Sequence, residues 1–255
     1  MTRHRILMLL AASLCTVLTS VSGIAEASET IVNNAEILYI GKFSAANPGD
    51  KIPSGWEPLT FEKIKKHTDY RLIEDNGATV VQAKSDASAS GLIRKIRIDP
   101  RKYPIIEWRW KATNIYKKGD VTQKSGDDYP ARIYIAFEYD PEKVGFFERA
   151  KFGGIKMFYG EYPPIGAINY IWASHAPVGK IVPNAYTDRV RMIVVESGKM
   201  KAGAWVSESR NIFDDYKTAF GKEPPMITGI AIMTDSDNTG ESALAYYGDI
   251  IMKSL

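Results

Sequence analysis

The sequence predicts an all-β protein, an antiparallel β-sandwich of jelly-roll type with about ten strands and one or two peripheral helices. Short runs rich in β-branched and aromatic residues recur along the chain, and Gly, Pro, Asn and Asp separate them. No regular helical pattern alternates with these runs, which argues against a doubly wound parallel sheet. The predicted strands cover residues 37–43, 79–84, 91–98, 105–112, 132–139, 168–173, 190–196, 204–212, 227–234 and 243–252.

The N-terminal segment has the pattern of a secretory signal peptide. An apolar run follows the basic start and extends from Ile6 to about Val21, and Ala25 and Ala27 fit a peptidase cleavage site. We therefore expect residues 1–27 to be removed, residues 28–255 to form a single β-sandwich domain, and the protein to be periplasmic or secreted. The only cysteine, Cys15, lies in the segment to be removed, which excludes disulfides, thiolate metal sites and a cysteine nucleophile from the mature chain.

Charge and motifs exclude further classes of function. The formal net charge is +3, which gives no electrostatic reason to expect nucleic acid as a partner. The chain contains no Gly-x-Ser-x-Gly nucleophile elbow, no phosphate-binding Gly-Lys-Ser/Thr loop and no dinucleotide-binding Gly-x-Gly-x-x-Gly.

Two of the predicted strands alternate clearly between apolar and polar residues. Their apolar sets share one face each and are expected in the core. These sets are Ile106, Trp108 and Trp110 in the first strand, and Ile133, Ile135 and Phe137 in the second. Arg132 and Tyr134 fall on the opposite face of the second strand. A polar sheet face of this kind is a place where a jelly roll can hold a ligand.

Two segments carry helix signals. The first, 141–159, follows Asp140 as N-cap and begins with Pro141. Its aromatic and basic composition suits a helix that covers a sheet edge, and less often one that contacts an anionic membrane. The second, 212–220, is short and stops at Gly221.

Several motifs together carry a resemblance to a known family. They are Asn47-Pro-Gly49, Pro53-x-Gly-Trp56, Ser85-Asp-Ala-Ser-Ala-Ser-Gly91, Trp108-Arg-Trp110, Gly126-Asp-Asp-Tyr-Pro130, Thr187-Asp-Arg-Val-Arg191 and Thr234-Asp-Ser-Asp-Asn-Thr-Gly240. Over almost all of the predicted mature chain, the sequence resembles the bacterial family known as "domain of unknown function 3047", a resemblance that implies no particular activity. More distantly, Ile227-x-x-Ile-Ala-Ile232 and Tyr246-Tyr-Gly-Asp-Ile250 resemble the closing strands of galactose-binding-type carbohydrate-binding jelly rolls. That likeness implies a fold and does not settle a function.

The acidic loop after the run 227–234 is a candidate metal site. Asp235, Asp237 and Thr239 occupy the first, third and fifth positions of a loop with Gly240 at the sixth, which is how calcium loops gather oxygen ligands. The twelfth position is Tyr246, however, where a helix-loop-helix site has a bidentate Glu. Ca²⁺ binding and a turn held by side-chain to backbone hydrogen bonds both fit this loop.

The long polar connection 117–130 supplies a second acidic segment. Asp127 and Asp128 directly precede the strand that carries Arg132 and Tyr134, so they could reach the same rim as Asp235 and Asp237. Carboxylates gathered there suit a cation or sugar hydroxyls, and solvated loop charges are the alternative.

Other polar and aromatic residues complete the candidate ligand site. Arg132, Arg189 and Arg191, with Glu196, alternate along strands and would suit an acidic saccharide, although cross-strand ion pairs explain them equally well. Trp172 offers a stacking surface, whereas Trp108 and Trp110 are expected in the core. His175 is placed to act as a base beside Tyr170 or Ser174, or simply as a hydrogen-bonded surface residue.

These observations favour an exported, non-catalytic module that binds a glycan or similar polar ligand at its acidic loop end, with Ca²⁺ as a candidate accessory ion. An envelope polysaccharide hydrolase or lyase is the first alternative, because a free choice of carboxylate pairs exists. A structural cell-envelope protein that uses the segment 141–159 is the second.

Overall fold

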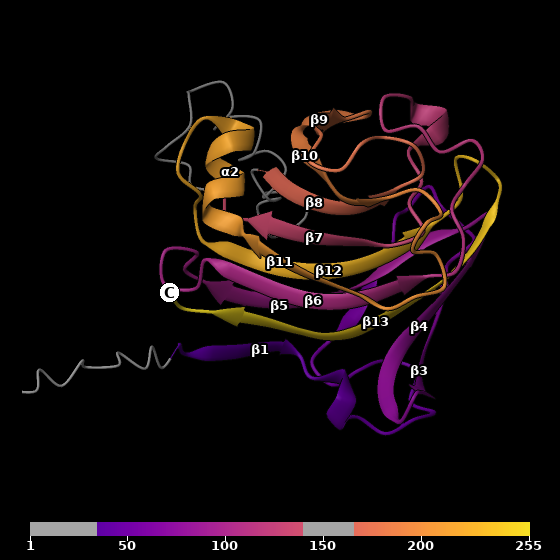
Figure 1. The fold of residues 1–255 in the computed structure, drawn as a ribbon, viewed down its shortest axis with the longest axis horizontal. Helices are drawn as coiled ribbons and strands as arrows, with labels where there is room; N and C mark the ends of the chain where they lie inside the picture. The colour runs from indigo at the N-terminus through magenta and orange to yellow at the C-terminus, as the bar shows by residue number, and fades with distance from the viewer. Residues whose placement is uncertain (1–34, 140–165) are drawn as a thin grey trace, which may run out of the picture. The chain divides into compact units, whose positions relative to one another are not determined.

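A computed structural model describes residues 35–139 and 166–255, all of which belong to one compact unit, Asn34–Leu255. Within these residues the chain forms two β-sheets and one α-helix (Figure 1), which confirms the predicted all-β sandwich. Among the described residues, no helix is long and apolar enough to cross a membrane. The predicted signal peptide and the predicted helix over 141–159 lie outside the described residues.

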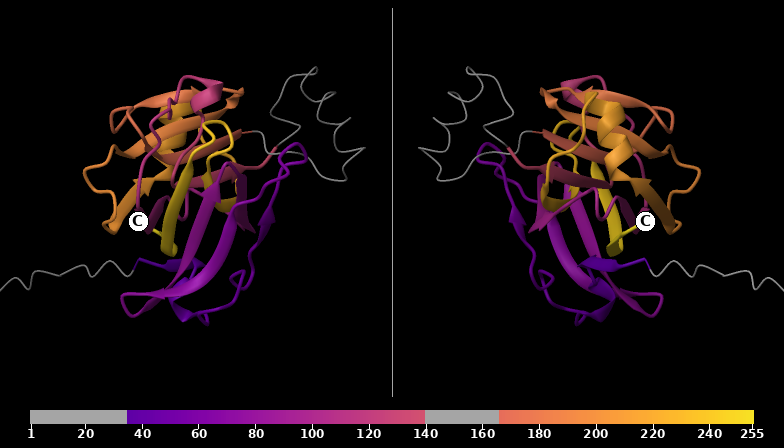
Figure 2. Two further views of the ribbon diagram at one scale, coloured as in Figure 1. Left: turned by 90° about the vertical axis from the view of Figure 1, so that its right-hand side faces the viewer. Right: turned by 90° about the vertical axis from the view of Figure 1, so that its left-hand side faces the viewer.

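One sheet has six strands. Its order is β11-β6-β13-β4-β3, with β1 beside β13. The bounds are β1 Ile37–Gly41, β3 Asp69–Asp75, β4 Ala78–Asp86, β6 Ile105–Ala112, β11 Val206–Asn211 and β13 Ser242–Lys253. A 3-10 turn, η1 (Phe43–Ala45), follows β1. In the side views of Figure 2, the purple hairpin of β3 and β4 extends away from the orange strands at the top of the molecule.

The other sheet has seven strands in the order β2-β5-β12-β7-β8-β10-β9. The bounds are β2 Glu57–Leu59, β5 Ala89–Ile98, β7 Arg132–Phe137, β8 Gly166–Ala173, β9 Ile181–Asn184, β10 Thr187–Ser197 and β12 Ile227–Asp235. A second 3-10 turn, η2 (Lys124–Gly126), lies in the connection between β6 and β7.

Aromatic rings from both sheets meet in the core between them. The Trp108 ring of β6 stacks on Tyr170 of β8 with centroids 5.3 Å apart, and Trp110 lies 6.0 Å from Trp172. Trp108 and Trp110 are buried, as predicted, because alternation along β6 turns both toward the facing sheet. Large aromatic surfaces buried in this way contribute much of the apolar burial that stabilises a sandwich.

The seven-stranded sheet differs from the prediction in two ways. First, β8 and β10 are parallel, whereas every other pair is antiparallel, so the sheet is mixed. Second, the outer face of β8 is not an open polar surface, because all eight of its residues are buried. A small second core covers that face and consists of Val121, Tyr129, Ile171, Ala173, Met192 and Val194. Alternation within a strand cannot reveal a loop that folds back over it.

The helix α2 (Ile212–Phe220) has the predicted bounds. Its N-cap is Asn211, whose side chain accepts a hydrogen bond from the Asp214 backbone N–H, and Gly221 ends it in the left-handed conformation at φ 70°. Three strands, β2, β3 and β9, were not predicted. All three lie at the edges of their sheets, where charged residues and prolines are tolerated and weaken the strand pattern.

Candidate functional site

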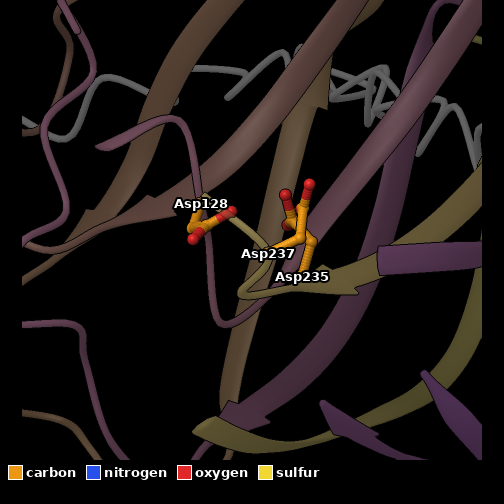
Figure 3. A group of neighbouring side chains, drawn as sticks. All are labelled: Asp128, Asp235 and Asp237. Atoms are coloured by element: carbon orange, nitrogen blue, oxygen red, sulfur yellow. The ribbon is translucent and has the colours of Figure 1, made fainter. Parts of the chain in front are cut away.

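Two loops meet at one end of the sandwich and bring acidic side chains together. Asp127 and Asp128 end the connection that leads into β7, whereas Asp235 and Asp237 lie where β12 ends. We call these four residues the acidic end. Carboxylate oxygens of Asp128, Asp235 and Asp237 all lie within 4.8 Å of one another (Figure 3). The two acidic segments therefore meet in space, which the sequence alone left open.

Asp128 fastens the acidic loop to the rest of the site. Its Oδ2 accepts a 2.6 Å hydrogen bond from the Thr239 backbone N–H, and its Oδ1 accepts bonds from the backbone and side-chain N–H groups of Asn238. The Thr239 hydroxyl in turn accepts a bond from the Glu241 N–H. Thr239 therefore stabilises the turn through hydrogen bonds, which is the second of the two roles that fit this loop.

Asp235 is the counter-ion of a buried arginine. Its Oδ2 lies 2.7 Å from Nη2 of Arg132, and the two side chains are only 2% and 5% exposed. The guanidinium carbon also lies 5.3 Å and 5.2 Å from the ring centroids of Tyr129 and Tyr134. Within the described part of the chain, Arg132 Nε has no hydrogen-bond partner. A guanidinium so enclosed needs a carboxylate to offset its lost hydration.

Asp127 is held from two sides. Its Oδ1 accepts a 2.9 Å bond from the Tyr129 hydroxyl, and its Oδ2 accepts a 2.7 Å bond from the Asn184 side chain. Asn184 ends β9, so this contact ties the edge of the seven-stranded sheet to the acidic end. The exposed Tyr186 hydroxyl then donates to the Asn238 side chain, which continues the polar rim.

The acidic end resists full ionisation. Burial raises the pKa of Asp235 well above its usual range despite the Arg132 guanidinium, and the charges of Asp128, Asp127 and Asp237 raise it further. Burial, followed by Asp128, also raises the pKa of the exposed Asp237. The pKa of Asp127 is raised mainly by burial. Four acids beside a single buried arginine leave an excess of negative charge that a bound cation would offset.

The donor set fits a hard cation in part. All of its atoms are oxygens, the ligands that Ca²⁺ takes, and each carboxylate has about four lone-pair sites. Among the described residues, no other residue donates to the Asp237 carboxylate, and the donors to Asp235 and Asp128 leave some of their sites unused. Tyr246 cannot close the loop, because its ring lies under Lys111 Nζ, 4.2 Å from the centroid, in the six-stranded sheet. Further ligands would have to be backbone carbonyls or water.

The predicted arginine set does not assemble, and this part of the prediction is wrong. Arg132 projects from the outer face of the seven-stranded sheet, whereas Arg191 is paired with Ile168, a residue of the inner face. Arg191 donates to the carbonyls of Ala219 and Asp188 and packs on Phe220, so it fixes the end of α2. Arg189 lies two residues before Arg191 on the same strand, so it shares the face of Arg191 and not that of Arg132.

Three further predicted site residues lie elsewhere. Trp172 is 0% exposed and its indole N–H donates to the Gly198 carbonyl, so it offers no stacking surface to a ligand. Glu196 is buried and pairs with Lys201.

His175 and its two candidate partners are also apart from one another in their contacts. His175 is exposed and contacts the Lys117 carbonyl. The Ser174 hydroxyl accepts a hydrogen bond from the Tyr116 N–H, and Tyr170 is buried in the core. The proposed base and its partners are therefore not arranged as a catalytic group.

Several residues at the acidic end escaped sequence reasoning. Tyr129 and Asn184 contact Asp127 directly. Tyr186 and Lys118 contact the neighbouring Asn238 and Thr239, and Lys118 Nζ donates to the Thr239 carbonyl at 3.0 Å. Tyr129 could have been predicted from the sequence, because it directly follows Asp128 in the motif Gly126-Asp-Asp-Tyr-Pro130. Asn184 was not, because β9 itself lacks a clear strand pattern.

Comparisons with solved structures find distant likenesses. A mutant of a family 29 carbohydrate-binding module shares 8% identity at a TM-score of 0.34, covering 86% of this chain and 92% of that one. The family 30 carbohydrate-binding module of a cellulosomal cellulase of Clostridium thermocellum shares 10% identity at 0.39, covering 86% and 98%. The carbohydrate recognition domain of Emp47p shares 10% identity at 0.40, covering 85% and 95%. At these TM-scores the likenesses assign neither a ligand nor a residue.

No curated protein matches the chain. The family model described as "Protein of unknown function (DUF3047)" matches residues 54–251, which is most of the sequence. The chain therefore belongs to the DUF3047 family.

Proposed function

We propose that this protein is an exported, non-catalytic binding module that holds a saccharide or similar polar ligand at its acidic end, with Ca²⁺ as an accessory ion. The observation that carries the proposal is the convergence of Asp128, Asp235 and Asp237 within 4.8 Å, with Asp237 exposed. Carboxylates that retain free lone pairs accept hydrogen bonds from sugar hydroxyls and bind hard cations.

The rim of the acidic end adds groups suited to the same ligand. Tyr186 is 57% exposed and Lys124 Nζ lies 5.3 Å from its ring centroid, so an aromatic face and a cation stand beside Asn238 and Asp237. A sugar ring is apolar on its face and polar at its edge. The Tyr186 ring could therefore stack on the face of the sugar while the neighbouring amide and carboxylate bind its hydroxyls.

Thermal unfolding with Ca²⁺ and with a chelator tests the role of the ion. Because Ca²⁺ offsets the excess negative charge, it should raise the melting temperature of the wild type and fail to do so in Asp237→Asn. Asp50→Asn, an exposed acid far from the acidic end in the sequence, is the matched control and should behave like the wild type. Equal melting with Ca²⁺ and with the chelator in every variant would exclude the accessory ion.

The effect of pH on calcium binding has a defined sign. The raised pKa values of Asp235 and Asp237 mean that protons compete for the same oxygens as the ion. The stabilisation by Ca²⁺ should therefore be greatest at neutral pH and decline as the pH falls toward these pKa values. Melting curves across that range check this, and a calcium effect that grows on acidification would contradict it.

Export is part of the proposal and rests on the pattern of residues 1–27. Mass spectrometry of the protein from the periplasm or culture medium of an expressing bacterium should give a chain that begins at Ser28. Retention of the uncleaved chain in the cytoplasm would contradict this location.

One observation favours a second function, hydrolysis of a polysaccharide. Glu208 of β11 is half-buried, and burial followed by the charge of Glu196 raises its pKa to about 7. A carboxylic acid that is still partly protonated near neutral pH, beside a second carboxylate, suits general acid catalysis of glycoside cleavage. Release of reducing sugar by the wild type, lost in Glu208→Gln with folding intact, would favour the enzyme over the binding module.

A further inference from the structure

A groove of about 440 Å³ lies in the six-stranded sheet, away from the acidic end. It runs across β11, β6 and β13, where Ser207 is paired with Arg109, and Glu107 with Ile251. These side chains alternate with the inward-facing Trp108 and Trp110, so they lie on the outer face of the sheet. The volume is within the range of small-ligand sites.

Arg109 is held in the groove by packing. At Gly248 a Cβ atom would lie 2.5 Å from Cγ and Nε of Arg109, so only glycine lets this side chain lie across β13. The register of β13 also shifts between Tyr247 and Ile250, next to Gly248. On the other side, the guanidinium carbon lies 4.7 Å from the ring centroid of Trp205. The guanidinium is therefore positioned before any ligand arrives.

Trp205 is itself fixed in place. Its indole N–H donates a 2.7 Å hydrogen bond to Asp75 Oδ2, and the same oxygen accepts a 2.7 Å bond from Lys111 Nζ. The ring is only partly buried, so part of its surface stays accessible beside Arg109. Trp205 is thus a tryptophan that a ligand could reach.

Three acids line the groove, and two of them, Glu107 and Asp249, already have protein donors, whereas Oε1 of the half-buried Glu208 has no hydrogen-bond partner among the described residues. Glu107 lies 2.6 Å from Lys253 Nζ, and Asp249 accepts bonds of 2.8 Å and 2.6 Å from the backbone N–H and hydroxyl of Ser44. The donors of the groove do not have acceptors. Within the part of the chain that the structure describes, neither the Arg109 guanidinium nor the hydroxyls of Ser207 and Ser209 make a hydrogen bond. Arg109, Ser207 and Ser209 therefore leave hydrogen-bond donors free for an acceptor on a ligand.

We propose that this groove binds an acidic saccharide, with the carboxylate of a uronate unit on Arg109. A guanidinium presents its N–H groups as a planar fork that matches a carboxylate. Ser207 and Ser209 supply hydroxyls for the oxygens of the sugar, and Ile251 provides apolar surface for its face. Trp205 does not line the groove itself but packs against the Arg109 guanidinium beside it. The site lies on the other sheet from the acidic end and uses none of its residues, so it does not depend on calcium.

Calorimetric titration with three uronate oligosaccharides, from polygalacturonate, alginate and hyaluronan, tests the proposal, with cellotetraose as the neutral probe. At least one acidic probe should bind, with an affinity that falls as salt is added, and cellotetraose should bind much more weakly. Arg109→Ala should weaken binding by about tenfold or more, because it removes a charged hydrogen-bonding group. Arg109→Lys should recover only part of this loss, because an ammonium lacks the fork.

Matched variants separate the groove from other effects. Arg71→Ala removes an exposed arginine of β3 in the same sheet and should leave binding unchanged. Gly248→Ala should displace Arg109 and weaken binding while the melting temperature stays near that of the wild type. Asp237→Asn and calcium chelation should have no effect, so the groove can fail or succeed independently of the acidic end. Absence of binding by all three acidic probes, or binding unchanged in Arg109→Ala, would overturn the proposal.

Discussion

At the scale of single residues, Arg132 is the residue on which the acidic end depends most. It is buried between Tyr129 and Tyr134 and bonded to Asp235, and it is the positive charge that lies against these buried acids. Burial alone would lower the pKa of Arg132, but Asp235 and the neighbouring anionic groups raise it, so the guanidinium stays charged. The buried pair therefore survives only while both partners are present.

Replacing Arg132 should destabilise the fold strongly. Arg132→Met leaves Asp235 buried without a counter-ion, which we expect to lower the free energy of unfolding by about 3–5 kcal/mol. Adding Asp235→Asn should recover a substantial part of that loss, because the buried charge is then gone. Urea unfolding of the single and double variants measures both effects. Strictly additive losses would show that the pair is not coupled.

Glu208 should impose a pH dependence of its own. Its pKa is raised from 4.5 to about 7, first by burial and then by Glu196, so the folded state binds the proton more tightly than the unfolded chain does. Stability should therefore fall as the pH rises from about 4.5 to about 7, by at most about 3 kcal/mol.

Glu208→Gln should remove this decline and make the protein more stable than the wild type above neutral pH. Urea unfolding near pH 5 and near pH 8 gives the comparison. Glu62→Gln, an exposed acid, should change neither value. A wild type that is more stable at the higher pH would contradict the raised pKa.

At the scale of elements, the connection between β6 and β7 builds both the acidic end and the second core. It places Val121 and Tyr129 over the outer face of β8 and delivers Asp127 and Asp128 to the end of β12. At Gly126 the loop packs closely against its own backbone at residues 118–120. A Cβ atom at Gly126 would lie 2.5 Å from the Asp120 backbone nitrogen and 2.8 Å from the Lys118 carbonyl oxygen.

Gly126→Ala should loosen this loop without unfolding the sandwich. Overpacking against backbone atoms typically costs about 1–3 kcal/mol, and we expect an effect of this size together with faster proteolysis within 117–130. Ser125→Ala, at an exposed neighbour, is the control and should match the wild type. Unchanged stability and proteolysis in Gly126→Ala would mean that the loop is not packed as described.

Elements that depend on local sequence patterns, such as helix caps and apolar–polar alternation, were predictable from the sequence. The cap at Asn211 and Gly221 bounds α2, and alternation identified β6 from its first to its last residue. The edge strand β3 was missed, because its charged residues conceal it. The contact between Asp128 and Thr239 could only be anticipated as a shared rim, since it depends on two loops packing together. The burial of Trp172 and the separation of Arg132 from Arg191 depend on the mixed sheet, for which no local signal exists.

At the scale of the whole molecule, two surfaces offer opposite chemistry. The acidic end has unused acceptors and an excess of carboxylates, whereas the groove on the six-stranded sheet has unused donors around Arg109. The first suits cations and sugar hydroxyls, and the second suits carboxylates. Because the two lie on different sheets and share no residue, their occupation should be energetically independent.

Glycan binding by the acidic end tests the central claim most directly. The measurement is a glycan array probed with wild type, Asp237→Asn and Asp50→Asn, each with Ca²⁺ and with a chelator. Uronate glycans are left out of the comparison, because the groove around Arg109 is proposed to bind them without calcium. For the other glycans, the proposed function predicts signals with the wild type and Asp50→Asn that weaken on chelation and are lost in Asp237→Asn. No such signal for the wild type, or signals that are equal in Asp237→Asn and insensitive to the chelator, would contradict it.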